Sequence, residues 1–397
     1  MAQQDKKQIL ILGGGFGGIK AALELADQAD MAVTLLSDQG SFRYYPTLYR
    51  AATGGRLAAS TIPLPEIFAR RGVRLIKDTA KTIDRENRQV LAVSGKKYGY
   101  DELVIALGVI TNFFGIKGLE QYAYGIKSIE EASRLRDHLH KLLLDEGKPD
   151  LNYVIIGGGP TGVELAGALP GYLHQIMKRH DIQKRSLHID LVEAAPRLMP
   201  RMPAAYSRAL ARRLRKLGVT LYLGQSVEAE TADNLALGDH SIASHSVVWT
   251  AGVTNHPFFK ANNFALSERG KVTVNEYLQA EDHIYVVGDN ADTPYSGMAQ
   301  TALYDAIFVA GNLKRLAREK SLKAYKAKVP VYVTPVGPRW AAVLWGKAQI
   351  YGWLGWLLRS AADFAGFHDY EPWWRSSKHW LAENQDGSEV CSICAPK

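Results

Sequence analysis

The sequence is poor in cysteine and has no long apolar run. Its 397 residues include two cysteines, Cys391 and Cys394, both within the last seven positions. This excludes a disulfide scaffold, and in the body of the chain it excludes a cysteine-ligated cluster or a catalytic cysteine pair. No apolar stretch reaches the ~18–20 residues that a membrane-spanning helix needs. The N-terminal stretch lacks the apolar region of a signal peptide, so we expect a cytoplasmic protein.

The composition is that of an ordinary globular protein with a modest positive charge. Hydrophobic residues make up 47% and charged residues 22%, which excludes wholesale disorder. The length allows roughly two or three domains. The net charge of +8 suits nucleic acid or an anionic membrane, and the position of the charge decides between them.

Two segments share one pattern, a buried strand followed by a glycine-rich turn and a helix. The turns are GGGFGG at 13–18 and GGGPTG at 157–162. Each pattern is typical of a βαβ unit with parallel strands. The expected strands are 8–12 and 32–36 around the first turn, and 153–156 and 188–192 around the second.

The spacing of the glycines matches a dinucleotide-binding turn. The first glycine permits the bend, the second lets backbone N–H groups approach a pyrophosphate, and the third allows close helix packing. The helix N-terminus adds a positive dipole. One copy is weak, because glycines in such a turn are often only structural, but two copies indicate two dinucleotide sites. The matching glycines are Gly13, Gly15 and Gly18 in the first turn, and Gly157, Gly159 and Gly162 in the second.

An acidic residue is expected at the end of the next strand, where it would bind a ribose. In the second unit this residue is Glu193, and its carboxylate favours the free 2′-hydroxyl of NAD over the 2′-phosphate of NADP. Arg197, four residues later, leaves the strictness of that preference open. In the first unit Ser37 holds the position and Asp38 follows it. Because a slip of one residue turns a strand side chain to the other face, either is a candidate.

Two dinucleotide sites in one chain imply electron transfer between NAD(P)H and FAD. The pair Gly288-Asp289 supports this, because it ends a predicted strand at 283–287 and precedes a predicted helix at 299–318. A carboxylate at such a strand end can bind a flavin ribitol hydroxyl. Alone, a Gly-Asp pair indicates only a turn, and its position after both units favours the flavin interpretation.

Further motifs occur in a consistent order over about residues 8–312. They are Tyr44 to Tyr49 (YYPTLY), Ala106 to Gly108, Thr111 to Gly115, Gly157 to Gly167 (GGGPTGVELAG), Thr250 to Gly252 and Ala299 to Ala302. Together with the two turns and Gly288-Asp289, these motifs resemble the flavoproteins with two dinucleotide-binding domains. Within that group the chain resembles the type II NADH:quinone oxidoreductases.

The resemblance implies an α/β fold with two Rossmann-like domains. A discontinuous FAD-binding domain would comprise 1–112 and 253–329, and an NADH-binding domain at 113–252 would be inserted between its segments. Residues 330–397 would form a C-terminal amphipathic membrane-associating region and a polar tail. The implied cofactors are non-covalent FAD and NADH.

The resemblance also implies the site residues. FAD would lie on Gly13, Gly15, Gly18, Ala106, Gly108 and Asp289, and NADH on Gly157, Gly159, Gly162, Glu193, Ala251 and Gly252. The other cofactor-binding candidates are Phe16, Gly17, Ala80, Pro160, Thr161, Gly288 and Ala299. Glu164 would lie near the nicotinamide and flavin, and Gln300 beside the quinone head group. The family usually has a second Gln four residues later, where this chain has Tyr304, whose phenol can still donate to a quinone.

The activity implied is hydride transfer from NADH to flavin and then two-electron reduction of a membrane quinone, without a metal and without proton pumping. Burial beside a flavin would raise the pKa of Glu164 by desolvation, which suits a proton relay near neutral pH. The alternative for Glu164 is a helix-start carboxylate stabilised by the helix dipole.

The C-terminal region is aromatic and basic. Seven of the eight tryptophans lie within residues 340–380, and residues 310–380 hold twelve basic and four acidic residues, a surplus equal to the whole net charge. This favours an anionic membrane surface over nucleic acid. An apolar stripe at helical spacing supports attachment to the cytoplasmic face of a membrane. Its members are Ile350, Trp353, Leu354, Leu357, Leu358, Ala361, Phe364 and Ala365, with Arg359, Ser360 and Asp363 mainly off the stripe.

Alternatives remain for the stripe and for the activity. The stripe would otherwise pack on the FAD domain or on a second subunit, and we expect a homodimer, which can present paired helices to a bilayer. A sulfide:quinone oxidoreductase needs cysteines beside the flavin, which the body of this chain lacks. A reductase of a soluble protein carrier has no clear use for the tryptophan-rich region, and a non-catalytic redox sensor does not need two adjacent sites. Cys391 and Cys394 are interpreted as a bystander pair.

Overall fold

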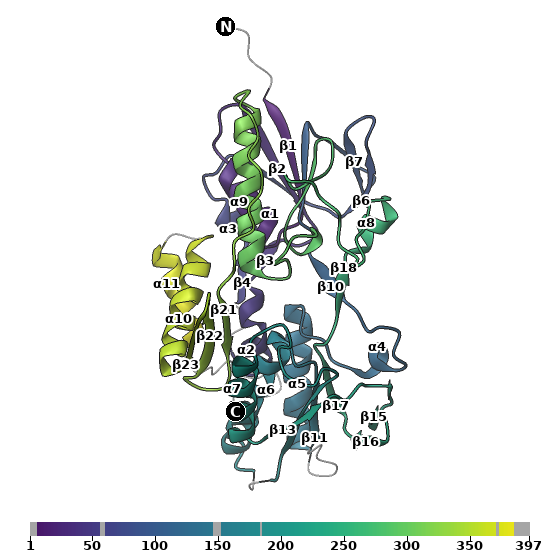
Figure 1. Ribbon diagram of the computed structural model, residues 1–397, viewed down its shortest axis with the longest axis vertical. Helices are drawn as coiled ribbons and strands as arrows, with labels where there is room; N and C mark the ends of the chain where they lie inside the picture. Colours follow the sequence, from purple (N-terminus) through teal and green to yellow (C-terminus); the bar gives the residue numbers. More distant parts are fainter. Residues whose placement is uncertain (1–5, 56–59, 146–151, 183–184, 371–372, 385–397) are drawn as a thin grey trace.

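The computed structural model describes residues 6–55, 60–145, 152–182, 185–370 and 373–384. Cys391 and Cys394 lie outside these residues. Two largely parallel sheets lie at opposite ends of the molecule, and the C-terminal region lies along one side, between and beside them (Figure 1).

The first sheet has six strands in the order β19-β20-β9-β1-β2-β5. The centre of this sheet is buried, since residues 9–12 of β1 are at most 1% exposed. Helices α1 (Phe16–Leu25) and α9 (Ala299–Leu316) pack together over it (Figure 1). The strands are β1 (Lys7–Leu12), β2 (Met31–Ser37), β5 (Val73–Lys77), β9 (Glu102–Ile105), β19 (Gln279–Glu281) and β20 (Ile284–Val286).

The second sheet has four parallel strands in the order β13-β12-β11-β17. The short helix α2 (Leu48–Ala52), which belongs to the first part of the chain, packs into the core of this second sheet. The strands are β11 (Asn152–Ile156), β12 (His188–Glu193), β13 (Val219–Leu223) and β17 (Ser246–Trp249), and the covering helices are α5 (Ile129–Leu144), α6 (Pro160–Arg179) and α7 (Ala204–Lys216).

The sequence predicted the strands around both glycine turns at their observed positions. The predicted strands are confirmed as β1, β2, β11 and β12, and the helix predicted at 299–318 is confirmed as α9. The two halves are joined by an antiparallel pair, β10 (Val109–Thr111) with β18 (Val253–Asn255), so the chain crosses twice between them.

Small elements complete the two halves. They are β3 (Ser41–Arg43), η1 (Tyr45–Thr47), β4 (Thr61–Pro63), α3 (Leu64–Ile67), β6 (Ala80–Asp84), β7 (Gln89–Ala92), β8 (Lys97–Gly99), α4 (Leu119–Tyr122), β14 (Ala229–Glu230), β15 (Asn234–Leu237), β16 (His240–Ala243), α8 (Pro257–Ala261) and η3 (Gly288–Asn290).

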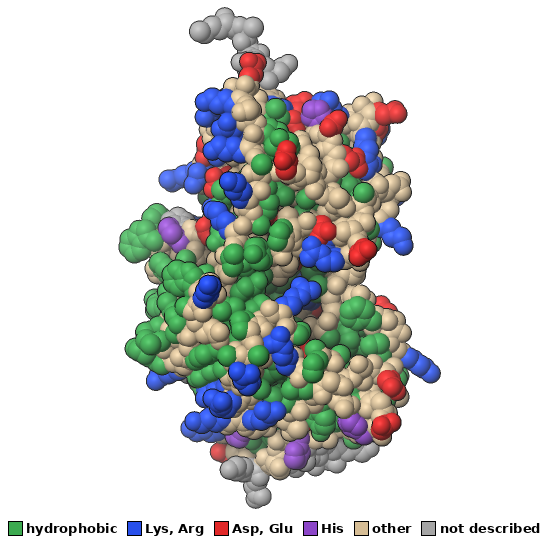
Figure 2. Space-filling view, in the orientation of Figure 1, with side chains coloured by type: hydrophobic (Ala, Val, Ile, Leu, Met, Phe, Trp, Pro, Cys, Tyr) green, Lys and Arg blue, Asp and Glu red, His purple; other side chains and the backbone are tan. Residues whose placement is uncertain are grey.

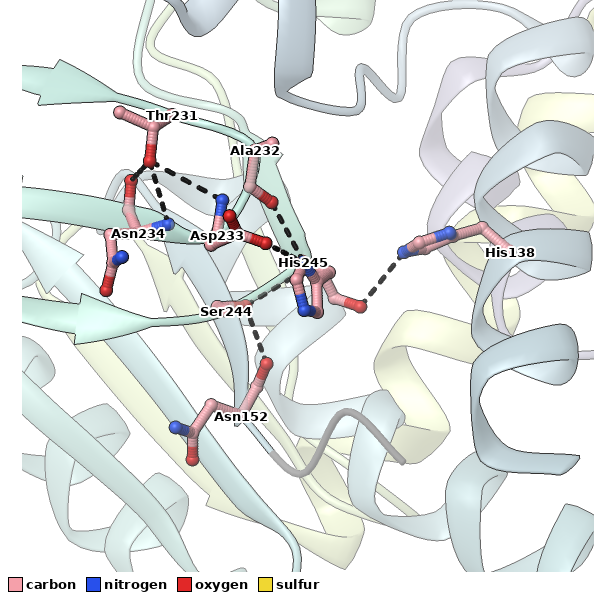
Figure 3. A network of polar contacts seen from close by, with 9 residues as sticks. His138, Asn152, Thr231, Ala232, Asp233, Asn234, Ser244 and His245 are labelled. Carbon is pink, nitrogen blue, oxygen red and sulfur yellow. Dashed lines mark hydrogen bonds and ion pairs between the residues drawn. The ribbon is translucent and has the colours of Figure 1, made fainter. Parts of the chain in front are cut away.

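A network of polar contacts fastens the β14–β16 sheet to the second parallel sheet (Figure 3). Ser244 donates to the carbonyl of Asn152 at 2.7 Å, and the ring of His245 lies 2.8 Å from the carbonyl of Ala232. On the other side, Nε2 of His138 lies 3.0 Å from the hydroxyl of Ser246. Burial lowers the pKa of His138 to about 4, so this contact holds a neutral ring at pH 7.

The C-terminal region begins with a three-stranded antiparallel sheet that sequence analysis did not predict. The strands are β21 (Tyr332–Pro335), β22 (Ala341–Trp345) and β23 (Ala348–Gly352). The expectation that Ile350 belongs to the helical stripe is therefore wrong, because Ile350 lies in β23 and pairs with Val343. The signal for this hairpin was Gly346, which has φ 58° in the two-residue turn between apolar runs.

The helix that follows, α10 (Trp353–His368), buries its charges and exposes its apolar side chains. Arg359 is 6% and Asp363 4% exposed, whereas Trp353 is 57% and Leu354 59% exposed. The helix α11 (Trp373–Asn384) also exposes large apolar side chains, and Figure 2 shows hydrophobic side chains gathered over α10 and α11. Within the described part of the chain, no helix has both the length and the apolar character to cross a bilayer.

Candidate active site

In the first glycine turn, the two outer glycines have no room for a side chain, whereas the glycine between them faces open space. Gly13 has φ 108°, and a Cβ there would overlap the carbonyl oxygen of Ala106. A Cβ at Gly18 would overlap the carbonyl oxygen of Gly13, but one at Gly15 would meet no atom within 4 Å. The open glycine is the N-cap of α1, where free N–H groups and the helix dipole favour an anion. The turn therefore fits a pyrophosphate of FAD.

The second turn repeats this arrangement. Gly157 has φ 113°, and a Cβ there would lie 2.8 Å from the Cα of Ala251. A Cβ at Gly162 would overlap the carbonyl oxygen of Gly157, and one at Gly159, the N-cap of α6, would meet nothing within 4 Å. The same open space at a helix N-terminus fits the pyrophosphate of NADH.

The structure shows that Ser37, and not Asp38, stands where Glu193 stands in the second unit. Ser37 is the last residue of β2 and is 2% exposed, and its Oγ accepts the N–H of Gln39, two residues on. Glu193 is the last residue of β12, and its Oε1 accepts the N–H of Ala195, also two residues on. Asp38 is exposed. Ser37 is therefore the counterpart of the acidic residue.

Glu193 also accepts a hydrogen bond from the second glycine turn, whereas the guanidinium of Arg197 donates to backbone carbonyls. Oε2 of Glu193 accepts the N–H of Gly158 at 2.5 Å. The guanidinium of Arg197 donates to the carbonyls of Met202 at 2.8 Å and Pro200 at 2.5 Å. Arg197 is thus held by backbone carbonyls, and the carboxylate of Glu193 is held by backbone N–H groups of Gly158 and Ala195.

Asn290 fixes the turn that follows β9, and the sequence did not reveal it. It is fully buried, its Oδ1 accepts the N–H of Gly108 at 2.8 Å, and its Nδ2 donates to the carbonyl of Gly108 at 2.6 Å. Nδ2 also donates to Asn255 in β18. Asn290 thus joins the turn after β9 to the crossing strand. Its place directly after Gly288-Asp289 was the available signal.

The Gly288-Asp289 pair lies at the start of η3, beside α9. Oδ1 of Asp289 accepts the N–H of Gly297 at 3.1 Å, and the N–H of Gly288 donates to Asp305 of α9. Asp305 is fully buried and also accepts the hydroxyl of Tyr325 at 2.5 Å. Burial raises the pKa of Asp305 to about 6.

Glu164 lies in the first turns of α6, in a buried cluster of charged and phenolic groups. It is 9% exposed, and burial raises the pKa of its carboxyl to about 8. The charges that act on it come from Arg50 of α2 and from Arg359 and Asp363 of α10. Glu164 is therefore protonated over most of the neutral range and can donate or accept a proton.

The proposed quinone residues lie one turn apart on α9, against the extended segment 320–331. Oε1 of Gln300 accepts the N–H of Val331 at 2.8 Å, and the ammonium of Lys328 lies 4.9 Å from the centre of the Tyr304 ring. This segment runs back along α9 and is held again at Asn312, which bonds both backbone groups of Lys323. The amide nitrogen of Gln300 is the donor that remains for a ligand.

The other predicted residues occupy several environments. Phe16 is 8% exposed and packs on Phe42 with ring centroids 5.0 Å apart. Gly17 faces Val287, and Gly252 lies against Asn112, whose N–H donates to its carbonyl at 3.1 Å. Pro160 and Thr161 begin α6, Ala299 begins α9, and Ala80 begins β6.

Comparison with known proteins identifies the class of this fold. Residues 7–306 match the family model of the pyridine nucleotide-disulphide oxidoreductases. The match spans most of the chain and includes both glycine turns and Gly288-Asp289. The chain belongs to the pyridine nucleotide-disulphide oxidoreductase family, which confirms the predicted α/β dinucleotide-binding fold.

Within this class the chain is similar to proteins named type II NADH:quinone oxidoreductase. It is 29% identical over 337 residues to one from Mycobacterium tuberculosis, covering 78% of this chain and 72% of that protein. It is 26% identical over 336 residues to one from Staphylococcus saprophyticus, covering 79% and 83%. The structure of NDH2 from Plasmodium falciparum in complex with NADH has the same fold, with a TM-score of 0.85, 16% identity and coverage of 95% and 97%.

Proposed function

We propose that this chain is an NADH:quinone oxidoreductase of type II, which uses FAD to pass two electrons from NADH to a membrane quinone. The observation that carries the proposal is the pair of glycine turns, each closed at its outer glycines and open at a helix N-terminus. In balance, NADH, one proton and quinone yield NAD⁺ and quinol. FAD, when bound, supplies the two-electron chemistry between nicotinamide and quinone.

The residues of the first half would hold FAD. The N–H groups at the start of α1 bind the pyrophosphate beside Gly15, and Ser37 faces the ribose. Asp289 binds the flavin side chain, and Asn290 fixes the turn around Gly108, whose backbone atoms it bonds at 2.6 and 2.8 Å. These residues would bind and orient FAD, and none of them is required to change its charge.

The residues of the second half would hold NADH. The N–H groups at the start of α6 bind the pyrophosphate beside Gly159, and the carboxylate of Glu193 binds the ribose hydroxyls. The Ala251-Gly252 turn would close the nicotinamide end of the site. The Cα of Ala251 in this turn leaves no room for a side chain at Gly157. Glu164, on the same helix, holds or releases the proton that quinone reduction consumes.

The quinone would lie against α9. The amide nitrogen of Gln300 donates to a quinone carbonyl, and Tyr304 takes the place of the family's second Gln. Segment 320–331 forms one wall, since Gln300 holds the backbone of Val331 and Tyr304 lies beneath Lys328.

The C-terminal region would place this site at an anionic membrane on its cytoplasmic face. The supporting observation is the exposed apolar surface of α10, α11 and the hairpin tip, where Trp345 is 62% exposed next to Lys347. Lysine and arginine near anionic lipid contribute about 1 kcal/mol each. A homodimer would present two such surfaces to one bilayer.

A single sequence of additions tests the activity. Protein reconstituted with FAD is mixed anaerobically with NADH, and the flavin absorbance is followed before and after a quinone analogue is added. We expect bleaching by NADH and recovery with quinone. Bleaching by sulfide but not by NADH, recovery only with a soluble protein carrier, or no bleaching at all would each overturn the proposal.

Vesicle flotation tests the membrane assignment separately. Full-length protein should float with anionic vesicles and less with neutral ones, and a variant truncated before residue 349 should remain in solution. If the truncated protein still floats, the attachment surface lies elsewhere.

A further inference from the structure

The segment between Glu193 and Glu228 carries only positive charge. Residues 194–227 include seven arginines and lysines and no acidic residue. The segment contains α7 and belongs to the second half of the molecule, so the positive charge of the chain is not confined to the C-terminal region. The seven are Arg197, Arg201, Arg208, Arg212, Arg213, Arg215 and Lys216.

Four of these cations form one exposed stripe on α7. Arg208, Arg212 and Arg215 recur at helical spacing and so share one face of the helix, with Lys216 beside them. All four are exposed, whereas the opposite face of α7 is buried. Among the described residues none of the four forms an ion pair. Because like charges at this spacing repel each other, an anionic partner outside the chain would stabilise the stripe.

Two inner side chains of α7 fix this helix to the C-terminal hairpin sheet. The hydroxyl of Tyr206 donates to the carbonyl of Ala342 in β22 at 3.0 Å. The guanidinium of Arg213 donates to the carbonyls of Val336 and Pro338, each at 3.1 Å, in the turn between β21 and β22. The stripe and the C-terminal region therefore belong to one rigid unit.

The exposed cations and the exposed tryptophan of the hairpin sheet adjoin this unit. Arg339 is exposed in the turn whose carbonyls bind Arg213, the residue after Arg212 of the stripe. Trp345 is 62% exposed at the hairpin tip, next to exposed Lys347. Figure 2 shows Lys and Arg side chains over α7, beside the hydrophobic side chains of the C-terminal region. Cations that border an exposed apolar surface are typical of a protein face that lies on an anionic bilayer.

We propose that the stripe of α7 contacts the headgroups of an anionic membrane, so that the second half of the molecule and the C-terminal region lie on the same bilayer. The inference rests on the proposed function, because it takes the apolar surface of α10 and α11 to enter that bilayer. An anionic phospholipid fits better than nucleic acid, since a duplex would not bury the apolar surface beside the stripe. The apolar surface provides attachment, and the stripe sets the orientation of the NADH-binding half on the membrane.

The test compares matched double variants of full-length protein with FAD. Arg208→Gln with Arg212→Gln removes two cations of the stripe, and Arg208→Lys with Arg212→Lys keeps both charges. Lys96→Gln with Lys97→Gln removes the same charge from an exposed site at the start of β8 in the first half. Binding is measured by flotation with vesicles of phosphatidylcholine alone and with vesicles of equal parts phosphatidylcholine and phosphatidylglycerol. Oxidation of NADH with a water-soluble quinone analogue checks that each variant is folded.

Only the variant with two glutamines on α7 should bind anionic vesicles more weakly. Its partition onto them should fall about 25-fold, roughly fivefold for each cation, which corresponds to about 1 kcal/mol per residue. Its partition onto neutral vesicles and its oxidation of NADH should not change. The two lysines on α7, and the two glutamines in the first half, should leave both partitions unchanged. The 25-fold difference should shrink as salt rises from about 0.1 M to about 1 M, because the Debye length falls from about 10 Å to about 3 Å.

Equal flotation of the glutamine variant of α7 and the unaltered protein would overturn the proposal. An equal loss in the Lys96 and Lys97 variant would also overturn it, since net charge alone would then explain the binding. Loss of affinity for a labelled DNA duplex with unmoved flotation would assign the stripe to nucleic acid instead.

A second pair keeps the test decisive. If the first glutamine variant does not fold, Arg215→Gln with Lys216→Gln must show the same loss on anionic vesicles. Failure of the unaltered protein to float with anionic vesicles would end the proposed membrane attachment together with this inference. Flotation of the unaltered protein that no α7 variant weakens would end only this inference.

Discussion

The two halves of the molecule use the same backbone turn with different residues at the end of the second strand. In each half the outer glycines are locked by backbone oxygen or Cα atoms and the middle glycine faces open space. The first half then has Ser37, whose hydroxyl accepts one N–H, and the second has Glu193, whose carboxylate accepts two. The turn provides a generic pyrophosphate site, and the strand-end residue adapts each copy to its own dinucleotide.

The largest expected effect comes from filling the second turn. In Gly162→Ala the new Cβ overlaps the carbonyl oxygen of Gly157, which is backbone and cannot move aside. We expect the KM for NADH to rise roughly 100-fold, about 2.7 kcal/mol, while the FAD content measured by absorbance stays the same. Gly171→Ala, where a Cβ on the same helix meets nothing within 4 Å, is the control. Loss of FAD in Gly162→Ala would show that the two halves do not bind independently.

Exchanging the strand-end residue should have a smaller effect. Glu193→Ser places the residue of the first half in the second, and it removes a hydrogen bond to a charged group worth about 1.5–2 kcal/mol. Steady-state kinetics should show the KM for NADH about 10- to 30-fold higher, and the preference over NADPH should shrink. Glu228→Ser, an exposed acid of the same half, should change neither. An unchanged KM for NADH would remove Glu193 from the ribose site.

A third prediction separates the two half-reactions. Gln300→Ala removes the acceptor of the Val331 N–H and the proposed donor to quinone, so the KM for a quinone analogue should rise about 10-fold, as one lost hydrogen bond of ~1.4 kcal/mol requires. Stopped-flow reduction of the flavin by NADH should keep its rate. Ile307→Ala, an exposed position on the same helix, is the control. Equal loss in both half-reactions would contradict the assignment.

The smallest effect concerns two buried glutamates that differ between the halves. Oε1 of Glu102 in the first sheet pairs with Lys7 at 2.9 Å and lies 3.1 Å from Nδ1 of His283, while its Oε2 has no hydrogen-bond partner among the described residues. Oε2 of Glu230 in the second half has no hydrogen-bond partner among the described residues, and burial raises its pKa to about 8. Since folded Glu230 binds its proton more tightly than unfolded Glu230, its contribution to stability falls as pH rises from about 4.5 to about 8.

Removing each charge tests this difference. Glu230→Gln should raise the free energy of unfolding at pH 8 by about 1 kcal/mol, because the buried amide still lacks partners and offsets most of the gain. It should also flatten the decline in stability between pH 5 and 8 measured by urea titration. Glu102→Gln should lower stability, since it leaves Lys7 without its partner. If the free energy of unfolding changes in the same direction in both variants, the proposed difference between Glu230 and Glu102 is wrong.

Sequence patterns predicted the parts of the site that are local. A short apolar run such as Ile9 to Leu12 that ends at a glycine cluster favours a buried strand. Gly13, which follows it, has φ 108°, a conformation that suits glycine in a tight turn. Both turns, their strands and α9 were therefore predicted at nearly their observed positions. The choice between Ser37 and Asp38 was not, because it depends on the register of β2 against β1 and β5.

Residues joined across long separations could not be found from local patterns. Asn290 is bonded to Gly108, 182 positions away, and Arg359 to Pro46, 313 positions away. No periodicity encodes such contacts, since each partner lies in a different element. The β21–β23 sheet was missed for a different reason, because Ile350 of β23 was interpreted as the first member of the amphipathic stripe.

The sequence by itself determined that this chain forms two strand–turn–helix units with room for a dinucleotide at each, because glycine spacing and apolar runs act through the nearest residues. It also determined that the C-terminal helix has one apolar and one charged face. Only the tertiary structure decided which face points inward. The reason is that folding brings Tyr44 and Pro46 to the inner face of this helix, where they bond the buried Arg359 and Asp363.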